Sequence, residues 1–456
     1  MPGTRRRRGL GVAAAGALVL ALAPAGADES QQSRDELAGL VEAFDRSLSS
    51  RADDAERRGL RARLAALTRE KLASSDWIDL HIAIRAIDRR LDPPPERVLR
   101  DGVPDPADGS DDPFDVACRI AGLAPAGRAH FAWSLRRIHG LAVTPEAVLQ
   151  VGRMARAAIA REIDERTPHD GSWHEMVEHC RDDHPASIEE LLATCHELVR
   201  DAGDLAERFG LVTIPERARD LEVLVAERAS PLPYARYRPP RFGSLRSHPA
   251  QISVPPIPHT FAPEDVDAWL RDFDVHFLRI VAAHEGVPGH HLQHVRSRQV
   301  RSRVRAHGFN TTFAEGWAFY AEGLVERAWE TPCVEDRVAA LRARSWRAVR
   351  CYADAALHLG RITPSEAVTL LMDEAGFSRR AAEADVRTIL RHPARMFGYW
   401  VGRRLIERMH DDYVRRNGPG TSREFHDRLL SFGTIPLPLA RAVLLDERAA
   451  YDARNP

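Results

Sequence analysis

The sequence predicts a mainly α-helical protein: a large helical body with a central cleft, one proline-rich extended segment and a small β element. Two observations carry this prediction. Apolar residues recur at helical spacing through most of the chain, as at Leu37, Leu40 and Phe44. Residues 229–259 interrupt that pattern with many prolines and almost no helical period.

The composition is that of an ordinary globular protein. The 456 residues include 65 Lys+Arg against 66 Asp+Glu, and 44% of them are hydrophobic. Such a chain can bury a large core, so whole-chain disorder and a fibrous rod are excluded. The formal net charge of −1 gives no reason to expect a nucleic acid as partner.

Residues 1–27 have the pattern of an export signal peptide. Arg5 to Arg8 form a basic start, Gly9 to Ala23 form a short apolar stretch, and Ala25-Gly26-Ala27 fits a cleavage site. The apolar stretch is shorter than the roughly 20 residues of a membrane span, which favours cleavage over an uncleaved anchor. We therefore expect a periplasmic or secreted protein with no stable membrane insertion after cleavage.

Residues 28–230 form the predicted N-terminal helical region. Helical spacing covers 33–91, 114–140, 144–166 and 186–209. The acidic, turn-rich residues 101–113 predict a loop between the first two blocks.

Residues 231–456 form the predicted C-terminal helical region, and we expect both regions to act as one integrated unit. Within the proline-rich segment, Gln251–Val254 predicts a short strand. The predicted helices that follow cover 263–306, 311–329, 334–359, 364–374, 378–391 and 396–416.

The cysteines give little guidance to function. None of the five forms a C-x-x-C pair, which excludes a cysteine-rich zinc finger. An exported protein can form disulfides, and Cys180 and Cys195 are the nearest pair, but buried free thiols explain each cysteine equally well.

Residues 280–322 carry the informative chemistry. His284-Glu285 followed by His290-His291 is similar to the H-E-x-x-H arrangement, in which two imidazoles hold Zn²⁺ and the glutamate is the general base. Three protein ligands leave one position for a water, whose pKa the metal lowers to about 7. Glu315 begins the next helical pattern and is the candidate third ligand, because a helix hairpin can return it to the metal.

The spacing of the histidines requires a distorted helix. On a regular helix His284 and His290 differ by about 240°, whereas His284 and His291 share a direction but lie about 10 Å apart along the axis. Pro288 and Gly289 supply a distortion, since proline lacks a backbone donor and glycine permits unusual dihedrals. We expect a local bulge that turns His290 to the metal, with His291 as the alternative ligand. The competing interpretation is a kinked helix with surface histidines.

A wider set of motifs resembles the bacterial family called domain of unknown function 885, which is itself similar to the gluzincin zinc metallopeptidases. The similarity covers roughly residues 180–450. Its motifs are residues 183–185, 211–215, 284–293, 315–322 and 347–350, Asp354, His358, Pro393, Tyr399, Gly402, residues 424–427 and Pro436-Leu437. The chain departs from the family pattern at Ala394 and Arg395, where the family has Gly and Gln.

The resemblance implies roles for nine residues. It makes His284, His290 and Glu315 the zinc ligands, and it favours His290 over His291. It makes Glu285 the general base and Tyr399 a donor to the oxyanion, although a packed aromatic is an equal interpretation of Tyr399.

Three further roles follow from the same resemblance. Arg347 and Arg350 are candidates to bind a substrate carboxylate, against surface charge in an arginine-rich chain. Asp354 and His358 lie four residues apart on one helix face, so Asp354 can orient His358 for proton transfer, against a plain surface contact.

The leading hypothesis is an exported zinc-dependent hydrolase of peptide or amide bonds. One alternative is a non-catalytic helical binding protein with a structural metal site. Another is a metal-dependent hydrolase or lyase of a small non-peptide molecule.

Overall fold

The computed structural model describes residues 25–49, 52–67, 69–96, 109–166, 172–227, 234–240 and 249–455. In these ranges the chain is mainly α-helical with one small sheet, which confirms the predicted fold class. The predicted signal peptide lies outside them except for its last three residues, which begin the first helix. Among the described helices, none combines the length and the apolarity that a membrane crossing requires.

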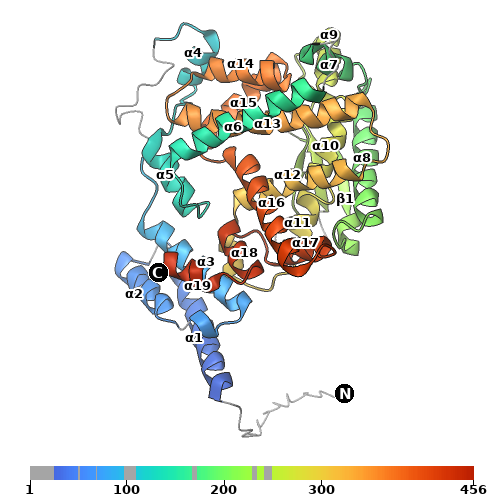
Figure 1. Ribbon diagram of the computed structural model, residues 1–456. Helices are drawn as coiled ribbons and strands as arrows, with labels where there is room; N and C mark the ends of the chain where they lie inside the picture. The colour runs from blue at the N-terminus through green and yellow to red at the C-terminus, as the bar shows by residue number, and fades with distance from the viewer. Residues whose placement is uncertain are drawn as a thin grey trace, which may run out of the picture.

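The first half of the chain forms helices of very different lengths (Figure 1). They are α1 (Ala25–Ser47), α2 (Asp54–Ala65), α3 (Ser74–Leu91), α4 (Pro113–Ile120), α5 (Gly127–Arg137), α6 (Pro145–Arg166), α7 (Trp173–Cys180) and α8 (Ile188–Arg208).

The small sheet follows α8 and contains the predicted strand. Its strands are β1 (Leu221–Val225), β2 (Arg236–Arg238) and β3 (Ala250–Val254), in the order β1-β3-β2. β1 runs parallel to β3 and β2 runs antiparallel to it, with Tyr237 opposite Ile252. β2 is therefore an edge strand, and its free side faces the helices that follow.

The second half is helical to its end. Its helices are α9 (Pro263–Leu270), α10 (Val275–Glu285), α11 (His290–Ser297), α12 (Thr311–Ala328), α13 (Val334–His358), α14 (Pro364–Ala375), α15 (Arg379–Arg391), α16 (Phe397–Asn417), α17 (Ser422–Ser431), α18 (Leu437–Leu444) and α19 (Arg448–Arg454). The prediction of one helix over 263–306 is wrong, because the chain breaks there into α9, α10 and α11. Asp274 is the N-cap residue of α10, and its side chain accepts a hydrogen bond from the Phe277 backbone N–H at 2.8 Å.

Helix α13 is the centre of the body. It packs against α6, α14, α16 and α10, and most of its side chains are buried. In Figure 1 it crosses the upper half of the molecule beside α6. Residues on α13 can therefore reach both the long N-terminal helices and α10.

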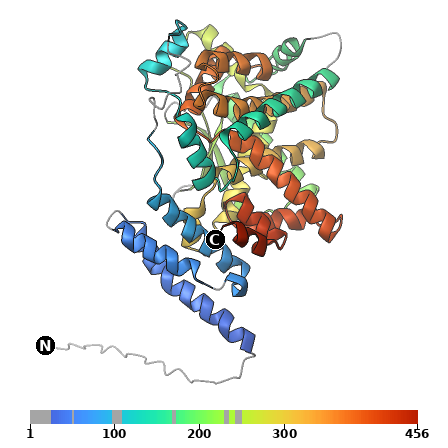
Figure 2. The same cartoon turned by 60° about the vertical axis from the view of Figure 1, so that its left-hand side comes forward.

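Two hydrophobic cores meet beside α12. One unites α5, α6, α8 and the sheet with α10 and α13–α15. The other unites α1–α3 with the C-terminal helices (Figure 2), where the Trp77 indole N–H donates to Asp452 at 3.1 Å. Helix α12 contributes Phe319 to the first core and Trp317 to the second, so α12 is held from both sides.

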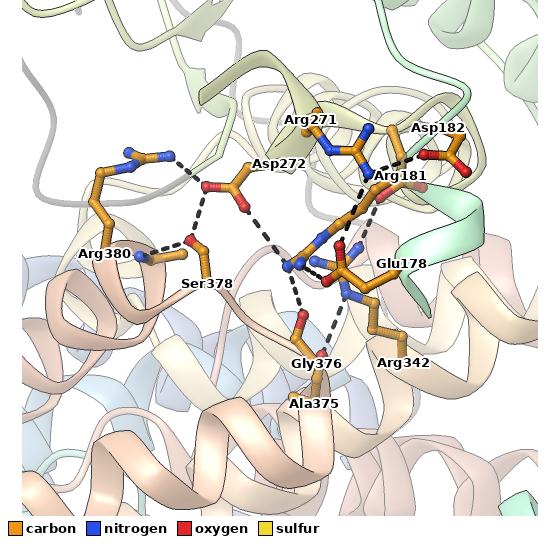
Figure 3. A network of polar contacts seen from close by, with 12 residues as sticks. Glu178, Arg181, Asp182, Arg271, Asp272, Arg342, Ala375, Gly376, Ser378 and Arg380 are labelled. Atoms are coloured by element: carbon orange, nitrogen blue, oxygen red, sulfur yellow. Dashed lines mark hydrogen bonds and ion pairs between the residues drawn. The ribbon is translucent and has the colours of Figure 1, made fainter. Parts of the chain in front are cut away.

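A polar network fixes the start of α10 against α13 (Figure 3). The buried Arg342 guanidinium donates to the Asp274 carboxylate at 2.7 Å and to the Ala375 carbonyl at 3.2 Å. Asp272 accepts from the Ser378 hydroxyl at 2.9 Å and is paired with Arg380. Each buried charge therefore has an opposite charge or a hydrogen-bond partner, as burial requires.

Candidate metal centre

The H-E-G-V-P-G-H segment is a sharp turn between two helices. α10 ends at Glu285 and α11 begins at His290, with a cis peptide bond between Val287 and Pro288. A Cβ atom on Gly289 would overlap the carbonyl oxygen of His284, so only glycine allows the turn to fold back onto α10. The predicted bulge within one helix is thus a full break, and the break redirects His290.

The break brings His284 and His290 to the same carboxylate. Their Nε2 atoms lie 3.6 and 3.1 Å from Oε2 of Glu315, which α12 supplies. The two rings are 4.7 Å apart and nearly perpendicular. All three residues are less than one tenth exposed, and the three donor atoms lie within 4.8 Å of one another. We call these three residues the central cluster.

The donor set of the central cluster fits zinc. Two imidazole nitrogens and one carboxylate oxygen are a usual ligand set of catalytic zinc sites. Bonds of roughly 2.0–2.1 Å give a tetrahedron with edges of about 3.3 Å, and the two observed nitrogen–oxygen separations fall on either side of that value. Because the cluster supplies three donors, the fourth coordination position of such a tetrahedron is available to water or substrate.

Hydrogen-bond partners outside the central cluster orient both imidazoles toward it. Nδ1 of His284 is 2.6 Å from Oε1 of Glu322, which also accepts from Arg347 at 2.6 Å. Nδ1 of His290 is 3.5 Å from the Gln293 amide oxygen. Such partners fix the tautomer and the orientation of a ligating histidine. Burial opposes the charged ring, but the hydrogen bonds to Glu315 and Glu322 outweigh it and raise the pKa of His284 to about 9.

His291 points away from the central cluster. Its Nδ1 lies 3.3 Å from the Tyr237 hydroxyl, and the two rings pack against each other. Burial lowers the pKa of His291 to about 4, so its ring is neutral. Of the two adjacent histidines, the structure brings only His290 to His284 and Glu315.

Glu285 follows His284 at the end of α10 and is held by the sheet. Its Oε2 accepts the backbone N–H of Tyr237 on β2 at 2.7 Å. It lines a cavity of about 40 Å³ together with His284, Arg347, Arg350 and Tyr399. Five of the predicted site residues, carried by α10, α13 and α16, thus share one cavity.

Tyr399 reaches this cavity because α12 and α16 cross closely. A Cβ atom on Gly316 of α12 would lie only 2.6 Å from the Cα atom of Gly402, so neither glycine tolerates a larger residue. The Tyr399 ring stacks on the His284 ring at 5.9 Å and 14°. Burial and the nearby Glu315 carboxylate raise the pKa of Tyr399, so its hydroxyl stays protonated and can donate.

Arg347 and Arg350 are both engaged in buried ion pairs. Arg347 binds Glu322, and Arg350 binds Asp385 through its Nε and Nη2 atoms. Both guanidinium groups lie over the Trp346 ring, at 4.2 and 3.9 Å from its centroid. They line the cavity, but their charges are already compensated within the protein.

His358 lies away from the central cluster. Its Nδ1 accepts the Ala126 N–H at 3.0 Å and its Nε2 faces the Ile389 carbonyl at 3.1 Å. Asp354 accepts the backbone N–H groups of Ala394 and Phe397, both at 3.0 Å. The structure therefore places this pair in the support of the turn before α16 and not beside the cavity.

Glu322 and Tyr237 are among the residues that contact the site without having had a predicted role. Glu322 stands seven residues after Glu315 and hence on the same face of α12, a spacing that identifies it as a partner for His284. Tyr237 lies far away in the sequence, and no local pattern indicates that its N–H reaches Glu285.

The family assignment rests on a sequence profile. The profile of a family described as "bacterial protein of unknown function (DUF885)" matches residues 96–444. The chain belongs to the DUF885 family. The match begins well before residue 180, so the family unit includes α4–α8 as well as the helices around the central cluster.

Two solved structures share the DUF885 fold seen here. One, from Shewanella oneidensis, is described as a candidate lipoprotein of unknown function; it has 16% identity and a TM-score of 0.67, over 93% of this chain and 100% of that chain. The other, described as a candidate lipoprotein from Colwellia psychrerythraea, has 17% identity and a TM-score of 0.59, over 88% of this chain and 71% of that chain. A search of curated proteins gives no match.

Arg395, where this DUF885 member departs from the family pattern, lies next to the central cluster. The Arg395 Nη2 atom is 3.5 Å from Oε1 of Glu315, the oxygen that does not face the histidines. The side chain is 37% exposed, so its charge is partly screened by solvent. A cation therefore already neighbours the candidate zinc ligand.

Proposed function

We propose that the protein is an exported zinc-dependent hydrolase of peptide or amide bonds. One observation carries the proposal: the three donors of the central cluster converge beside a cavity that Glu285 also lines. Zinc, when bound there, would polarise the substrate carbonyl and lower the pKa of a water ligand to about 7.

The surrounding side chains can carry the proton transfers. Glu285, next to the ligand His284, can accept a proton from the attacking water and return it to the leaving nitrogen. Tyr399 keeps its proton and can donate a hydrogen bond to the oxyanion. Arg347 acts through Glu322 by orienting His284. Export rests on the pattern of residues 1–27.

The size of the cavity favours a small substrate. A volume of about 40 Å³ admits little more than a carbonyl group and a water. A small amide or a short peptide reaches the central cluster with less rearrangement than a folded protein does. A metal-dependent hydrolase or lyase of a small non-peptide molecule is the second candidate on the same observation.

Glu285→Gln tests the proposed mechanism. We expect this variant to bind one zinc ion at the central cluster as the wild type does and to lose turnover of short peptides and amides by at least about 10³-fold. Zinc content by mass spectrometry and a dipeptide library measure the two properties. His290→Ala should lose the zinc, and His291→Ala is its matched control. A fully active Glu285→Gln protein would contradict the role of Glu285.

A further inference from the structure

A second set of metal-ligand side chains lies at the other end of α10. His276 is in the first turn of α10, Cys333 directly precedes α13, and Asp336 is in the first turn of α13. Their donor atoms all lie within 4.8 Å of one another. Nδ1 of His276 is 3.0 Å from Oδ1 of Asp336 and 3.8 Å from Sγ of Cys333. We call these three residues the surface cluster.

The separations in the surface cluster suit a tetrahedral metal. With zinc–sulfur bonds of about 2.3 Å and zinc–nitrogen bonds of roughly 2.0–2.1 Å, a sulfur–nitrogen edge measures about 3.6 Å. The observed Sγ–Nδ1 separation is close to that value. Cysteine, histidine and aspartate are each ligands of zinc, and a thiolate favours zinc and other thiophilic divalent cations.

Neighbouring side chains orient the residues of the surface cluster through hydrogen bonds and ion pairs, as in the central cluster. Nε2 of His276 is 3.4 Å from Oδ2 of Asp183, which leaves Nδ1 directed at Cys333 and Asp336. Arg279 donates to Oδ2 of Asp336 at 2.6 Å, so Oδ1 is the oxygen that faces the cluster. A carboxylate behind an imidazole and a donor behind a carboxylate are the second-layer contacts expected around a bound metal.

Helix capping alone does not account for Cys333. It is the N-cap residue of α13, where its Sγ accepts the Asp336 N–H at 3.4 Å. Serine, threonine, aspartate and asparagine are the favoured N-cap residues, and a thiol is a weak acceptor. The other four cysteines are buried, whereas Cys333 is exposed beside a histidine and an aspartate. A role as metal ligand explains a thiol at this position.

We propose that His276, Cys333 and Asp336 form a second metal site, for zinc or a similar thiophilic divalent cation, that joins the first turns of α10 and α13. The same two helices carry Glu285 and Arg350 at the cavity. The metal would act beside the Arg342–Asp274 pair, which already ties the start of α10 to α13 in the interior. The site is therefore a structural link on the outer side of these helices.

Cobalt(II) distinguishes the two clusters because only the surface cluster contains sulfur. We expect the purified metal-free protein, kept reduced, to bind two cobalt ions per chain. One of them should give a sulfur-to-cobalt charge-transfer band in the near ultraviolet. Cys333→Ser and His276→Ala should each lose that band and one cobalt equivalent, whereas His290→Ala should lose the other equivalent and keep the band.

Two controls make the result decisive. Serine is a better N-cap than cysteine, so Cys333→Ser should fold, and circular dichroism verifies this. Cys180→Ser replaces a neighbouring buried thiol that is not part of the cluster, and it should keep both cobalt ions and the band. The proposal is wrong if the wild type shows no band, if the band survives in Cys333→Ser, or if Cys180→Ser abolishes it. None of these outcomes depends on the proposed hydrolase activity.

Discussion

Helix α10 has a candidate metal cluster at each end, and the two clusters differ in burial and in donor chemistry. At the C-terminal end, the central cluster is buried, has only nitrogen and oxygen donors, and borders the cavity that contains Glu285. At the N-terminal end, the surface cluster contains an exposed thiol. Both clusters have three protein donors, so their surroundings distinguish them: only the central cluster has a glutamate beside it, in the cavity, that can act as a base.

The two clusters also differ in how their charges are compensated. Behind the central cluster, Arg347 and Arg350 pair with Glu322 and Asp385 in the interior, and none of these side chains is more than 4% exposed. Behind the surface cluster, Arg279 is 36% exposed. Buried pairs hold a cavity wall rigid, but they are costly to break.

The two regions should differ most in the free energy of unfolding that is lost when one ion pair is broken in each. We expect Arg350→Ala to reduce the free energy of unfolding by about 3–5 kcal/mol, because it leaves the Asp385 carboxylate buried without its partner. Arg279→Ala, measured in metal-free protein, should cost at most about 1 kcal/mol. Urea unfolding measures both values. Equal losses would show that burial does not distinguish the two regions.

Histidines without a carboxylate partner should respond to acid in the opposite way from His284. Burial lowers the pKa of His426 to about 4, and its ring contacts the Leu211 carbonyl and the Tyr320 hydroxyl at 2.7 and 2.9 Å. The unfolded chain binds a proton near pH 6.5, so the contribution of this histidine is complete above that pH and lost as the pH falls to 4. The loss amounts to roughly 3 kcal/mol.

His426→Gln tests this assignment, because glutamine can donate to Leu211 and accept from Tyr320 without titrating. The stability difference between wild type and variant, from urea unfolding at pH 7 and pH 4.5, should shrink at the lower pH. A difference that is the same at both pH values would show that the pKa of His426 is not lowered in the folded protein.

Removing the charge of Glu322, which contacts His284, should weaken metal binding at the central cluster and leave metal binding at the surface cluster unchanged. We expect Glu322→Gln to lower the zinc affinity of the central cluster by about 10- to 100-fold, the usual effect of losing the outer partner of a ligating histidine. Glu326→Gln on the same helix is the matched control, because Glu326 pairs with Arg344 at 2.7 Å and contacts no ligand. Competition with a chromophoric chelator measures both affinities. A normal affinity in Glu322→Gln would mean that the orientation of His284 does not depend on this carboxylate.

The sequence predicted the site residues better than it predicted their surroundings. His284, Glu285, His290 and Glu315 lie within one segment, where the H-E element and the family resemblance selected them, and only the resemblance favoured His290 over His291. Helical periodicity likewise predicted the fold class, because it depends on neighbouring residues only.

The rest depends on tertiary contacts. Pro288 and Gly289 predicted a bulge but not the full break between α10 and α11, and the Tyr237–Glu285 hydrogen bond needs the edge strand of a sheet. The spacing of Asp354 and His358 was compatible with catalysis. In the structure, however, both side chains make hydrogen bonds to backbone groups: His358 to the residue before α5 and to α15, and Asp354 to the turn before α16. No local pattern carries such information.

Arg395→Gln should give the smallest effect, and in the direction of tighter binding. The guanidinium pairs with Glu315 on the side opposite the histidines, so its positive charge competes with a cation for the same carboxylate. Because the side chain is partly exposed, we expect the competition to cost less than about 1 kcal/mol, which is roughly a two- to fivefold difference in zinc affinity. The gain should be larger at low salt, because screening weakens the repulsion. Arg391→Gln, on the preceding helix, is the control for a general loss of positive charge. Weaker zinc binding in Arg395→Gln would mean that the arginine supports Glu315 as a ligand instead of opposing the metal.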